Sequence, residues 1–403
     1  MRAPPAFLPA LLKAISTALV LFALPLTAVA DPIVGPAPQR VEDRYVPKPN
    51  DVKLEIWVEG LEVPWSLVFL PGSERALVSE RPGRIRLIVK GKLREKPYMA
   101  LEAARGQSGL FGFFTRLFAG GEGGLMGLAV HPRFPEQPYI YAMHTYRSDK
   151  GTFNRVIRLI DQGDSARYDR VILDGIPGAS LHNGGRIAFG PDGLLYVSTG
   201  EIYEAEHADD LKSLGGKILR VTPDGAIPPD NPFPDSPVYS YGHRNPQGLA
   251  WHPGTGDLFI SEHGPSGEFG LGAHDEINVI RRGGHYGWPR AVGAPGHQKY
   301  VDPLISWKRT TTPPAGLAFW RGDLYLAVLG SGTLIRIGVS GKKGNYRITR
   351  IERLFAKGPQ ESVLGRLRAV AAGPDGLLYF SSSNRDGRGD PAPGDDKIYR
   401  LVP

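Results

Sequence analysis

The amino-acid sequence predicts an all-β protein, a six-bladed β-propeller, because it is rich in turn residues and repeats one turn-and-strand phrase six times. Glycine (52 residues) and proline (37) make up more than a fifth of the 403 residues, which is typical of many tight turns rather than long helices. After residue 30, no apolar pattern with helical periodicity extends beyond a few turns.

The repeated phrase is a turn containing Pro, Gly or Asp, followed by a short strand of alternating apolar residues. The six strands are Ala76–Val78, Tyr139–Tyr141, Leu195–Val197, Leu258–Ile260, Leu324–Leu326 and Leu378–Phe380. The prolines of the first four turns, at 71, 132, 191 and 253, are 61, 59 and 62 residues apart. One such unit cannot bury both faces of its sheet, so even spacing favours a closed ring over the alternative of paired β-sandwiches.

Ring closure is predicted to come from the two ends of the repeat region. Val52–Val58 is a strand before the first unit, and Lys397–Leu401 is a strand after the last. We expect both strands to lie in one blade. The predicted organisation is a signal peptide over residues 1–30, a proline-rich extended arm over 31–50 and a catalytic propeller over 51–403.

Residues 1–30 have the pattern of a secretory signal peptide. Arg2 and Lys13 form a basic end, Ala14–Leu26 is apolar, and Ala28–Ala30 has small residues where signal peptidase cuts. The apolar run is short against the roughly 20 residues that span a membrane, which disfavours the alternative of an uncleaved anchor. The sequence therefore predicts a periplasmic or secreted protein after cleavage near Ala30. Because the chain has no cysteine, no disulfide can stabilise it.

Charge and aromatic residues bear on possible partners. The formal net charge is +7 without a long run of Lys or Arg, so we expect no binding to nucleic acid. The glycine-rich segment 106–124 also carries Phe111, Phe113, Phe114 and Phe118. Such a loop could cover a substrate, dock a partner or touch a membrane surface, or it could pack on itself.

His182 is the leading candidate for a catalytic residue. It lies in the glycine-flanked stretch Leu181-His182-Asn183-Gly184-Gly185-Arg186, outside the repeated turn, whereas His131 and His252 each precede the turn proline. An imidazole suits removal of a proton from a hydroxyl group. The alternative is a structural histidine in a turn.

Three arginines are candidates for binding an anion. Arg244 precedes Asn245-Pro246, where proline favours extended backbone that could aim both side chains inward. A guanidinium group can stabilise negative charge on a carbonyl oxygen, although an inter-blade salt bridge is the alternative. Arg366 and Arg368 are two residues apart in a strand and face the same side, which suits a polyanionic cofactor or, alternatively, a solvated rim.

Candidate calcium ligands follow the fourth repeated strand. Gly264-Pro265 comes directly after it, and Asp275, Glu276 and Tyr286 lie further along. Calcium takes carbonyl and carboxylate oxygens in flexible geometry. No EF-hand loop, HExxH motif or cysteine cluster competes as a metal site.

In this order, the motifs resemble the soluble pyrroloquinoline-quinone (PQQ)-dependent sugar dehydrogenases, the glucose/sorbosone and aldose sugar dehydrogenase families. The resemblance covers about residues 52–401. Its most specific pieces are Gly121–Gly127, His182–Gly184, Tyr241–Gly248, Glu262–Pro265, Asp275–Asn278 and Gly284–Pro289. It implies a six-bladed propeller with PQQ over the central channel. It also implies oxidation of the anomeric hydroxyl of an aldose to a lactone, with electrons passed to a soluble or membrane quinone or cytochrome.

The resemblance also implies a role for each candidate residue. His182 corresponds to the general base, and Arg244 corresponds to a catalytic residue near the quinone carbonyl that gains negative charge. The implied cofactor contacts are Glu122, Arg244, Asn245 and the clamp Arg366 and Arg368. The implied calcium ligands are Gly264 and Pro265 at the quinone, with Glu276 and Tyr286 at a second, structural calcium.

Three positions depart from the family pattern. Glu122 stands where glutamine is frequent, and Leu181 stands where the glucose-specific branch has an acidic residue. The basic residue expected around Leu329–Ser331 is absent. Glucose specificity is therefore not expected, and one cation that would hold the cofactor is missing, for which Arg366 and Arg368 could compensate. A binding propeller without cofactor affinity is one alternative function. A calcium-dependent lactonase is another, and the His, Arg and carbonyl groups of the inward loops disfavour it.

Overall fold

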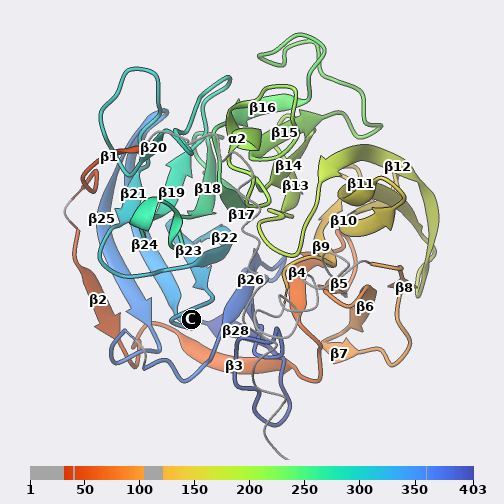
Figure 1. The fold of residues 1–403 in the computed structure, drawn as a ribbon. Coiled ribbons are helices and arrows are strands. Elements are labelled where there is room, and N and C mark those ends of the chain that lie inside the picture. Colours follow the sequence, from red (N-terminus) through yellow and green to blue (C-terminus); the bar gives the residue numbers. More distant parts are fainter. Residues whose placement is uncertain (1–30, 40, 104–120, 360) are drawn as a thin grey trace, which may run out of the picture. The chain divides into compact units, whose positions relative to one another are not determined.

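Six sheets of four or five strands follow one another along residues 53–402 of the computed structural model (Figure 1). The structure describes residues 31–39, 41–103, 121–359 and 361–403. The chain divides into residues 1–31 and 32–403, and the sheets belong to the second unit. The predicted signal peptide and the Phe111–Phe118 segment lie outside the described residues. Within the described ranges, no helix is both long and apolar enough to cross a membrane.

Each of the first three blades is an antiparallel meander. Blade one contains β4 (Pro64–Phe69), β5 (Arg75–Glu80), β6 (Arg84–Val89) and β7 (Lys92–Leu93), with β8 (Met99–Ala100) also on β6. Blade two contains β9 (Leu125–Val130), β10 (Tyr139–Ser148), β11 (Gly151–Asp161) and β12 (Ala166–Pro177). Blade three contains β13 (Ile187–Phe189), β14 (Leu195–Thr199), β15 (Lys217–Val221) and β16 (Val238–Tyr241). A short helix, α2 (Glu206–Asp209), lies between β14 and β15.

The remaining blades continue the ring. Blade four contains β17 (Asn245–Trp251), β18 (Leu258–His263), β19 (Asp275–Val279) and β21 (Ile305–Trp307), with the 3-10 turn η1 (Glu268–Gly270) before β19. Blade five contains β22 (Pro314–Trp320), β23 (Asp323–Val328), β24 (Leu334–Lys342) and β25 (Asn345–Leu354). Blade six contains β26 (Leu367–Ala372), β27 (Leu378–Ser382), β28 (Ile398–Val402) and β3 (Lys53–Val58). The first strand of each blade lies nearest the centre of the ring in Figure 1.

The predicted six-bladed propeller and its closure are confirmed. The last strand, β28, pairs antiparallel with β3 from the start of the ring, in a register that places Leu401 opposite Leu54 and Ile398 opposite Val58. The sheet that closes the ring is therefore built from both ends of the repeat region, as the sequence predicts.

The six repeated strands of the sequence are the second strands of the six blades: β5, β10, β14, β18, β23 and β27. The turn before them has the same chemistry in blades three and six. Asp192 accepts hydrogen bonds from the Leu194 amide (3.1 Å) and the Tyr196 hydroxyl (2.9 Å). Asp375 does the same with Leu377 (3.2 Å) and Tyr379 (2.7 Å). An aspartate that bonds the backbone two residues on stabilises such a turn.

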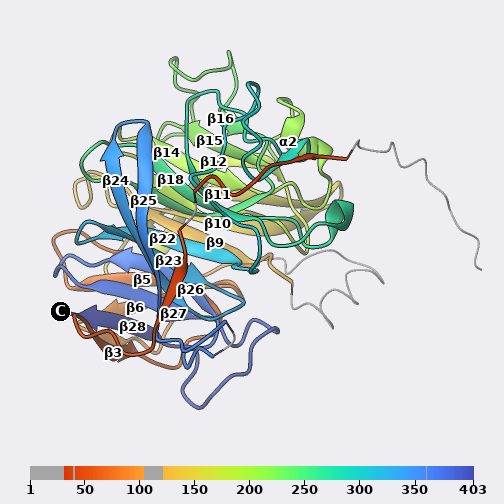
Figure 2. The same cartoon turned by 90° about the vertical axis from the view of Figure 1, so that its left-hand side faces the viewer.

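The proline-rich segment 31–50 contains two short strands. β1 (Ile33–Val34) pairs in parallel with β20 (Ala291–Val292), and β2 (Asp43–Val46) pairs in parallel with β25 as a fifth strand of blade five. β2 lies along β25 at the outer edge of this blade (Figure 2). Asp43 also accepts a hydrogen bond of 2.5 Å from the buried Arg353, which ties the segment to this blade.

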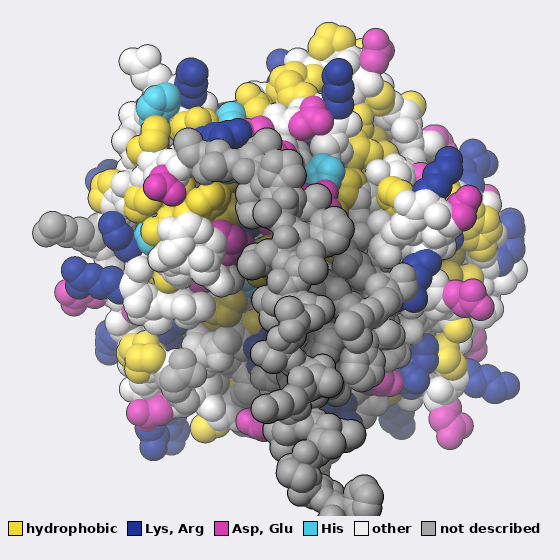
Figure 3. Space-filling model, in the orientation of Figure 1, with side chains coloured by type: hydrophobic (Ala, Val, Ile, Leu, Met, Phe, Trp, Pro, Cys, Tyr) yellow, Lys and Arg dark blue, Asp and Glu magenta, His cyan; other side chains and the backbone are white. Residues whose placement is uncertain are grey.

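The loops that enter the first strands carry four of the candidate residues, Glu122, His182, Arg244 and Arg366. Contacts connect these segments: the Asn245 side chain accepts a hydrogen bond from the Gly184 amide (2.9 Å), and Glu122 accepts one from the His182 amide (3.0 Å). Basic and acidic side chains are interspersed around the rim of the face drawn in Figure 3.

Candidate active site

His182 and Glu201 form a buried pair at the channel end. Nδ1 of His182 lies 2.5 Å from Oε1 of Glu201, and the two residues are 5% and 1% exposed. Burial, followed by the positive charge of Arg244, holds the pKa of His182 well below its usual value. Burial raises the pKa of Glu201 to about 8. When Glu201 is ionised it accepts the Nδ1 proton of neutral His182, which leaves Nε2 as the ring nitrogen that can accept a proton.

The backbone around this pair adopts left-handed conformations that non-glycine residues rarely take. His182 has a φ of 53°, Ile202 of 56° and Tyr203 of 66°. The Tyr203 ring stacks on the His182 ring with centroids 3.9 Å apart. Strained backbone of this kind concentrates at functional sites, where the surrounding structure holds it in place. The imidazole is therefore fixed on one edge by Glu201 and on one face by Tyr203.

Glu122 connects the His182 loop to blade six. Its carboxylate accepts the His182 amide proton through Oε2 and pairs with Arg388 through Oε1 at 3.2 Å. Burial opposes ionisation of Glu122, but the positive charge of Arg388, helped by the hydrogen bond from the His182 amide, lowers the pKa to about 2. The negative charge of Glu122, which stands where the family often has glutamine, is therefore balanced by Arg388.

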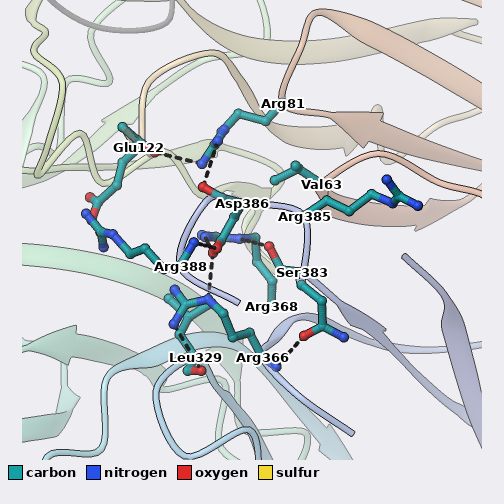
Figure 4. Close-up of polar contacts among 12 residues, drawn as sticks. Val63, Arg81, Glu122, Leu329, Arg366, Arg368, Ser383, Arg385, Asp386 and Arg388 are labelled. Carbon is teal, nitrogen blue, oxygen red and sulfur yellow. Dashed lines mark hydrogen bonds and ion pairs between the residues drawn. The ribbon is translucent and has the colours of Figure 1, made fainter. Parts of the chain in front are cut away.

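A cluster of arginines surrounds the buried Asp386 (Figure 4). Nε of Arg366 lies 2.8 Å and Nη2 of Arg368 lies 3.4 Å from the same oxygen of Asp386. Arg81 donates to the Asp386 carbonyl at 3.2 Å. Burial opposes ionisation of Asp386, but the charges of Arg366 and Arg368 outweigh it and lower its pKa. Arg385 points away from this cluster.

The charges of this cluster fit an anionic cofactor. Its basic groups are the guanidinium groups of Arg81, Arg366, Arg368 and Arg388. Among the described residues, Arg366 and Arg368 pair with the carboxylate of Asp386, and Arg388 pairs with that of Glu122 (Figure 4). Guanidinium groups bind carboxylates in a planar, two-pronged geometry.

The position that lacks the family's basic residue is reached by an arginine from the next blade. Nη1 of Arg366 donates to the Leu329 carbonyl at 3.3 Å. The adjoining residues Gly330–Gly332 line a cavity of about 460 Å³ together with Arg366 and Arg388. Positive charge therefore lies at this position although residues 329–331 contribute none.

Arg244 is buried and held from two directions. Its side chain donates through Nε (2.9 Å) and Nη2 (2.5 Å) to Oε1 of Glu268, and its backbone amide donates to Glu262. Its guanidinium lies 5.7 Å from the Tyr203 ring and 5.5 Å from the Trp288 ring. The structure therefore places Arg244 beside the His182–Glu201 pair and gives it a carboxylate partner on η1.

Gly264 and Pro265 line a small cavity of about 20 Å³ next to Arg244, which is space for one water molecule or ion. The Gly264 amide donates to Asp275 at 3.1 Å. A Cβ atom at Gly264 would lie 2.1 Å from the Ala273 carbonyl oxygen, so only glycine fits here. The His263 and Trp288 ring nitrogens Nε2 and Nε1 on the same cavity are buried without a hydrogen-bond partner among the described residues.

Glu262 and Glu276 face each other across β18 and β19 and line the same cavity. The Asn278 amide nitrogen lies 3.3 Å from each carboxylate, while its carbonyl oxygen has no hydrogen-bond partner in the described part of the chain. Burial, followed by the charge of Glu262, raises the pKa of Glu276 well above its usual value. Two carboxylates and an unpaired carbonyl oxygen are a ligand set that suits calcium.

Two observations limit this metal assignment. Within residues 31–39, 41–103, 121–359 and 361–403, no group of three or more His, Cys, Asp or Glu side chains could hold a metal ion by itself, so backbone and amide oxygens would have to complete the set. The Tyr286 hydroxyl donates to the Val279 carbonyl (2.7 Å) and accepts from the Arg281 amide (2.7 Å). The side chain of Tyr286 is therefore already engaged and shapes the site by packing, since its ring stacks on His243.

Comparison with known proteins decides the family. The family model described as glucose/sorbosone dehydrogenase matches residues 61–399. The chain belongs to this family. The aldose sugar dehydrogenase YliI of Escherichia coli K12 is 30% identical over 370 residues, which are 84% of this chain and 92% of that protein.

Solved structures of the family share the fold. The PQQ-bound form of aldose sugar dehydrogenase from Streptomyces coelicolor is 38% identical with a TM-score of 0.71, covering 88% of this chain and 98% of that one. A protein from Thermus thermophilus, assigned provisionally as an oxidoreductase (glucose dehydrogenase), is 51% identical with a TM-score of 0.78. That match covers 87% of this chain and all of the other.

Several residues of the site were not predicted from the sequence, and they occupy equivalent positions in their blades. Each follows the second strand of a blade, where an antiparallel hairpin returns the chain to the end at which the first strand begins. These residues are Arg81 after β5, Glu201 after β14 and Asp386 and Arg388 after β27. The signal that identifies them is a charged residue within a few positions of the end of a repeated strand.

Proposed function

We propose that the protein is a PQQ-dependent sugar dehydrogenase that oxidises the anomeric hydroxyl of aldoses to lactones, with His182 as general base. The pairing of His182 with Glu201 near a cluster of arginines carries this proposal. Membership of a family of sugar dehydrogenases supports it, as does the PQQ-bound form of the S. coelicolor relative.

The protein residues would divide the work as follows. Glu201 holds Nδ1 of His182 and leaves Nε2 as the proton acceptor for the substrate hydroxyl. Loss of the hydroxyl proton makes the carbon that carries this oxygen a stronger hydride donor. PQQ, when bound, supplies the two-electron acceptor for the hydride. Arg244 lies beside the pair and is suited to stabilise negative charge that develops on an oxygen there.

The same residues would hold the cofactors. Arg366 and Arg368 are suited to bind carboxylates of PQQ, with Asn245 and Glu122 at the edge of the site. The carbonyls of Gly264 and Pro265 would bind a calcium ion that acts as a Lewis acid. Glu276, with Glu262 and Asn278, would bind calcium in the adjacent cavity. Electrons would leave to an external acceptor, and the protein would act in the periplasm or outside the cell.

The test is dye-linked oxidation by purified protein across a panel of aldoses, with and without added PQQ and calcium. His182→Ala is compared with His252→Ala, a histidine whose Nδ1 accepts the Gly254 amide proton in a surface turn (3.2 Å). We expect PQQ-dependent turnover that the first variant abolishes and the second retains. Folded wild-type protein that neither binds PQQ nor turns over would instead identify a binding propeller. Turnover of lactones without PQQ would identify a hydrolase.

A further inference from the structure

A buried arginine, Arg186, has no role in the site described above. Arg186 directly precedes β13 and is 8% exposed. Its Nε donates to the Gln247 carbonyl at 2.9 Å, and Nη1 lies 3.4 Å from the Trp65 carbonyl. Its guanidinium carbon lies 4.2 Å from the centre of the Trp65 ring.

A second arginine shares both neighbours. The guanidinium of Arg368 lies 6.0 Å from the same Trp65 ring and donates to the Gln247 side-chain oxygen at 3.3 Å. Trp65 is 1% exposed and Gln247 is 3% exposed, so these groups lie away from bulk water. Two positive charges therefore lie close together inside the ring, and Arg368 belongs to the cluster around Asp386.

The two arginines differ in their counter-charge. Arg368 has Asp386 at 3.4 Å. Within the part of the chain that the structure describes, no carboxylate lies within salt-bridge distance of Arg186, and its Nη2 is buried without a hydrogen-bond partner. Burial, followed by the charge of Arg368, lowers the pKa of Arg186 to about 9, so the group remains charged at neutral pH.

The unpaired charge of Arg186 lowers the stability of the folded protein when no ligand is bound. A buried charge without a partner destabilises the folded state, and a neutral side chain could make the same two hydrogen bonds and fill the same space beside Trp65. The cost is offset if a bound anion supplies the missing negative charge. Arg368 connects Arg186 to the arginine cluster around Asp386, where the proposed anionic cofactor would bind.

We propose that Arg186 is a positioning residue for the anionic cofactor, whose negative charge offsets the buried positive charges of Arg186 and Arg368. This inference rests on the proposed function. It assigns Arg186 to cofactor affinity rather than to proton or hydride transfer. It also implies that the cofactor-free protein is less stable than its packing alone would allow.

The test compares Arg186→Gln with the matched control Arg220→Gln. Arg220 is equally buried at 6% exposure but pairs with Asp192 (3.0 Å) and Asp230 (2.9 Å) in blade three. PQQ affinity is measured by equilibrium dialysis, and the thermal midpoint of the cofactor-free protein by circular dichroism. For Arg186→Gln we expect at least about tenfold weaker PQQ binding, which corresponds to about 1.4 kcal/mol, with an unchanged or higher cofactor-free midpoint. For Arg220→Gln we expect unchanged PQQ binding and a lower midpoint.

Arg186→Lys separates charge from shape. It keeps the charge and loses the planar fork, so PQQ affinity near that of the wild type supports the electrostatic role. Unchanged PQQ affinity in Arg186→Gln would overturn the inference, and so would equal loss of affinity in the Lys and Gln variants. Wild-type protein that does not bind PQQ would instead overturn the proposed function, and this inference with it.

Discussion

Oε1 of Glu201 lies 2.5 Å from Nδ1 of His182, and both residues are almost completely buried. Glu201 follows β14, whereas His182 precedes β13, so the hairpin between these strands brings the two residues together from 19 positions apart. The contact fixes which ring nitrogen of His182 can act as a base. The basicity of His182 therefore depends on Glu201, a residue that stands in none of the family motifs found in the sequence.

Replacing Glu201 should impair turnover without impairing cofactor binding. In Glu201→Gln the amide carries no charge to stabilise the protonated imidazole, so we expect kcat to fall on the order of 10²- to 10³-fold. PQQ affinity should remain unchanged. Glu204→Gln is the matched control, because Glu204 is on the same loop and pairs with His207 instead. Equal activity of the two variants would exclude an orienting role for Glu201.

The pH dependence of turnover should follow the ionisation of the His182–Glu201 pair. Burial raises the pKa of Glu201 to about 8, so the carboxylate gains a proton as pH falls through that value. The form with an ionised Glu201 and a neutral His182 is the one that can accept a substrate proton. We therefore expect kcat/KM to rise about tenfold per pH unit below pH 8 and to level off above it. The measurement is initial rate from about pH 5.5 to about pH 9.5, and a flat profile would contradict the assignment.

The fold was predictable because local chemistry repeats with the blades. Each Pro, Gly or Asp turn leads into a second strand, and the aspartates of two turns bond the residues that follow them. The pairing of β2 with β25 was not predictable, because a short segment with mixed composition carries no periodicity that specifies a partner about 300 positions away. That pairing is decided by tertiary contacts such as the one between Asp43 and Arg353.

The candidate site was predictable only where a motif marks it. His182 and Arg244 stand in distinctive motifs, whereas Arg366 and Arg368 were identified by their two-residue spacing in a strand. The partners Glu201, Glu268 and Asp386 are ordinary acidic residues in loops, and their significance comes from the basic group that each one meets. Without knowledge of which residues meet in the fold, these three carboxylates cannot be distinguished from solvated ones on the surface.

Calcium should remove a pH dependence of stability that originates at Glu276. Burial and Glu262 raise the pKa of Glu276 in the folded protein, so its contribution to stability is present at low pH and is lost as pH rises through the folded pKa. In chelator we expect the thermal midpoint to fall as pH rises above 4.5, the usual pKa of a glutamate, and added calcium to restore it. Glu276→Gln should reduce both the pH dependence and the response to calcium. A calcium response that survives in Glu276→Gln would place the ion elsewhere.

The closing blade should make a large contribution to stability. Leu401 on β28 is completely buried opposite Leu54 of β3, whereas Ile56 on β3 is 53% exposed. Leu401→Ala removes buried apolar volume from the sheet that joins the two ends of the ring, so we expect a loss of about 2–5 kcal/mol in the free energy of unfolding. Ile56→Ala changes the same pair of strands on the exposed side and should cost less than about 1 kcal/mol. Denaturant unfolding of both variants measures the difference. Equal losses would show that the pairing of the strands, rather than the packing of their buried face, holds the ring closed.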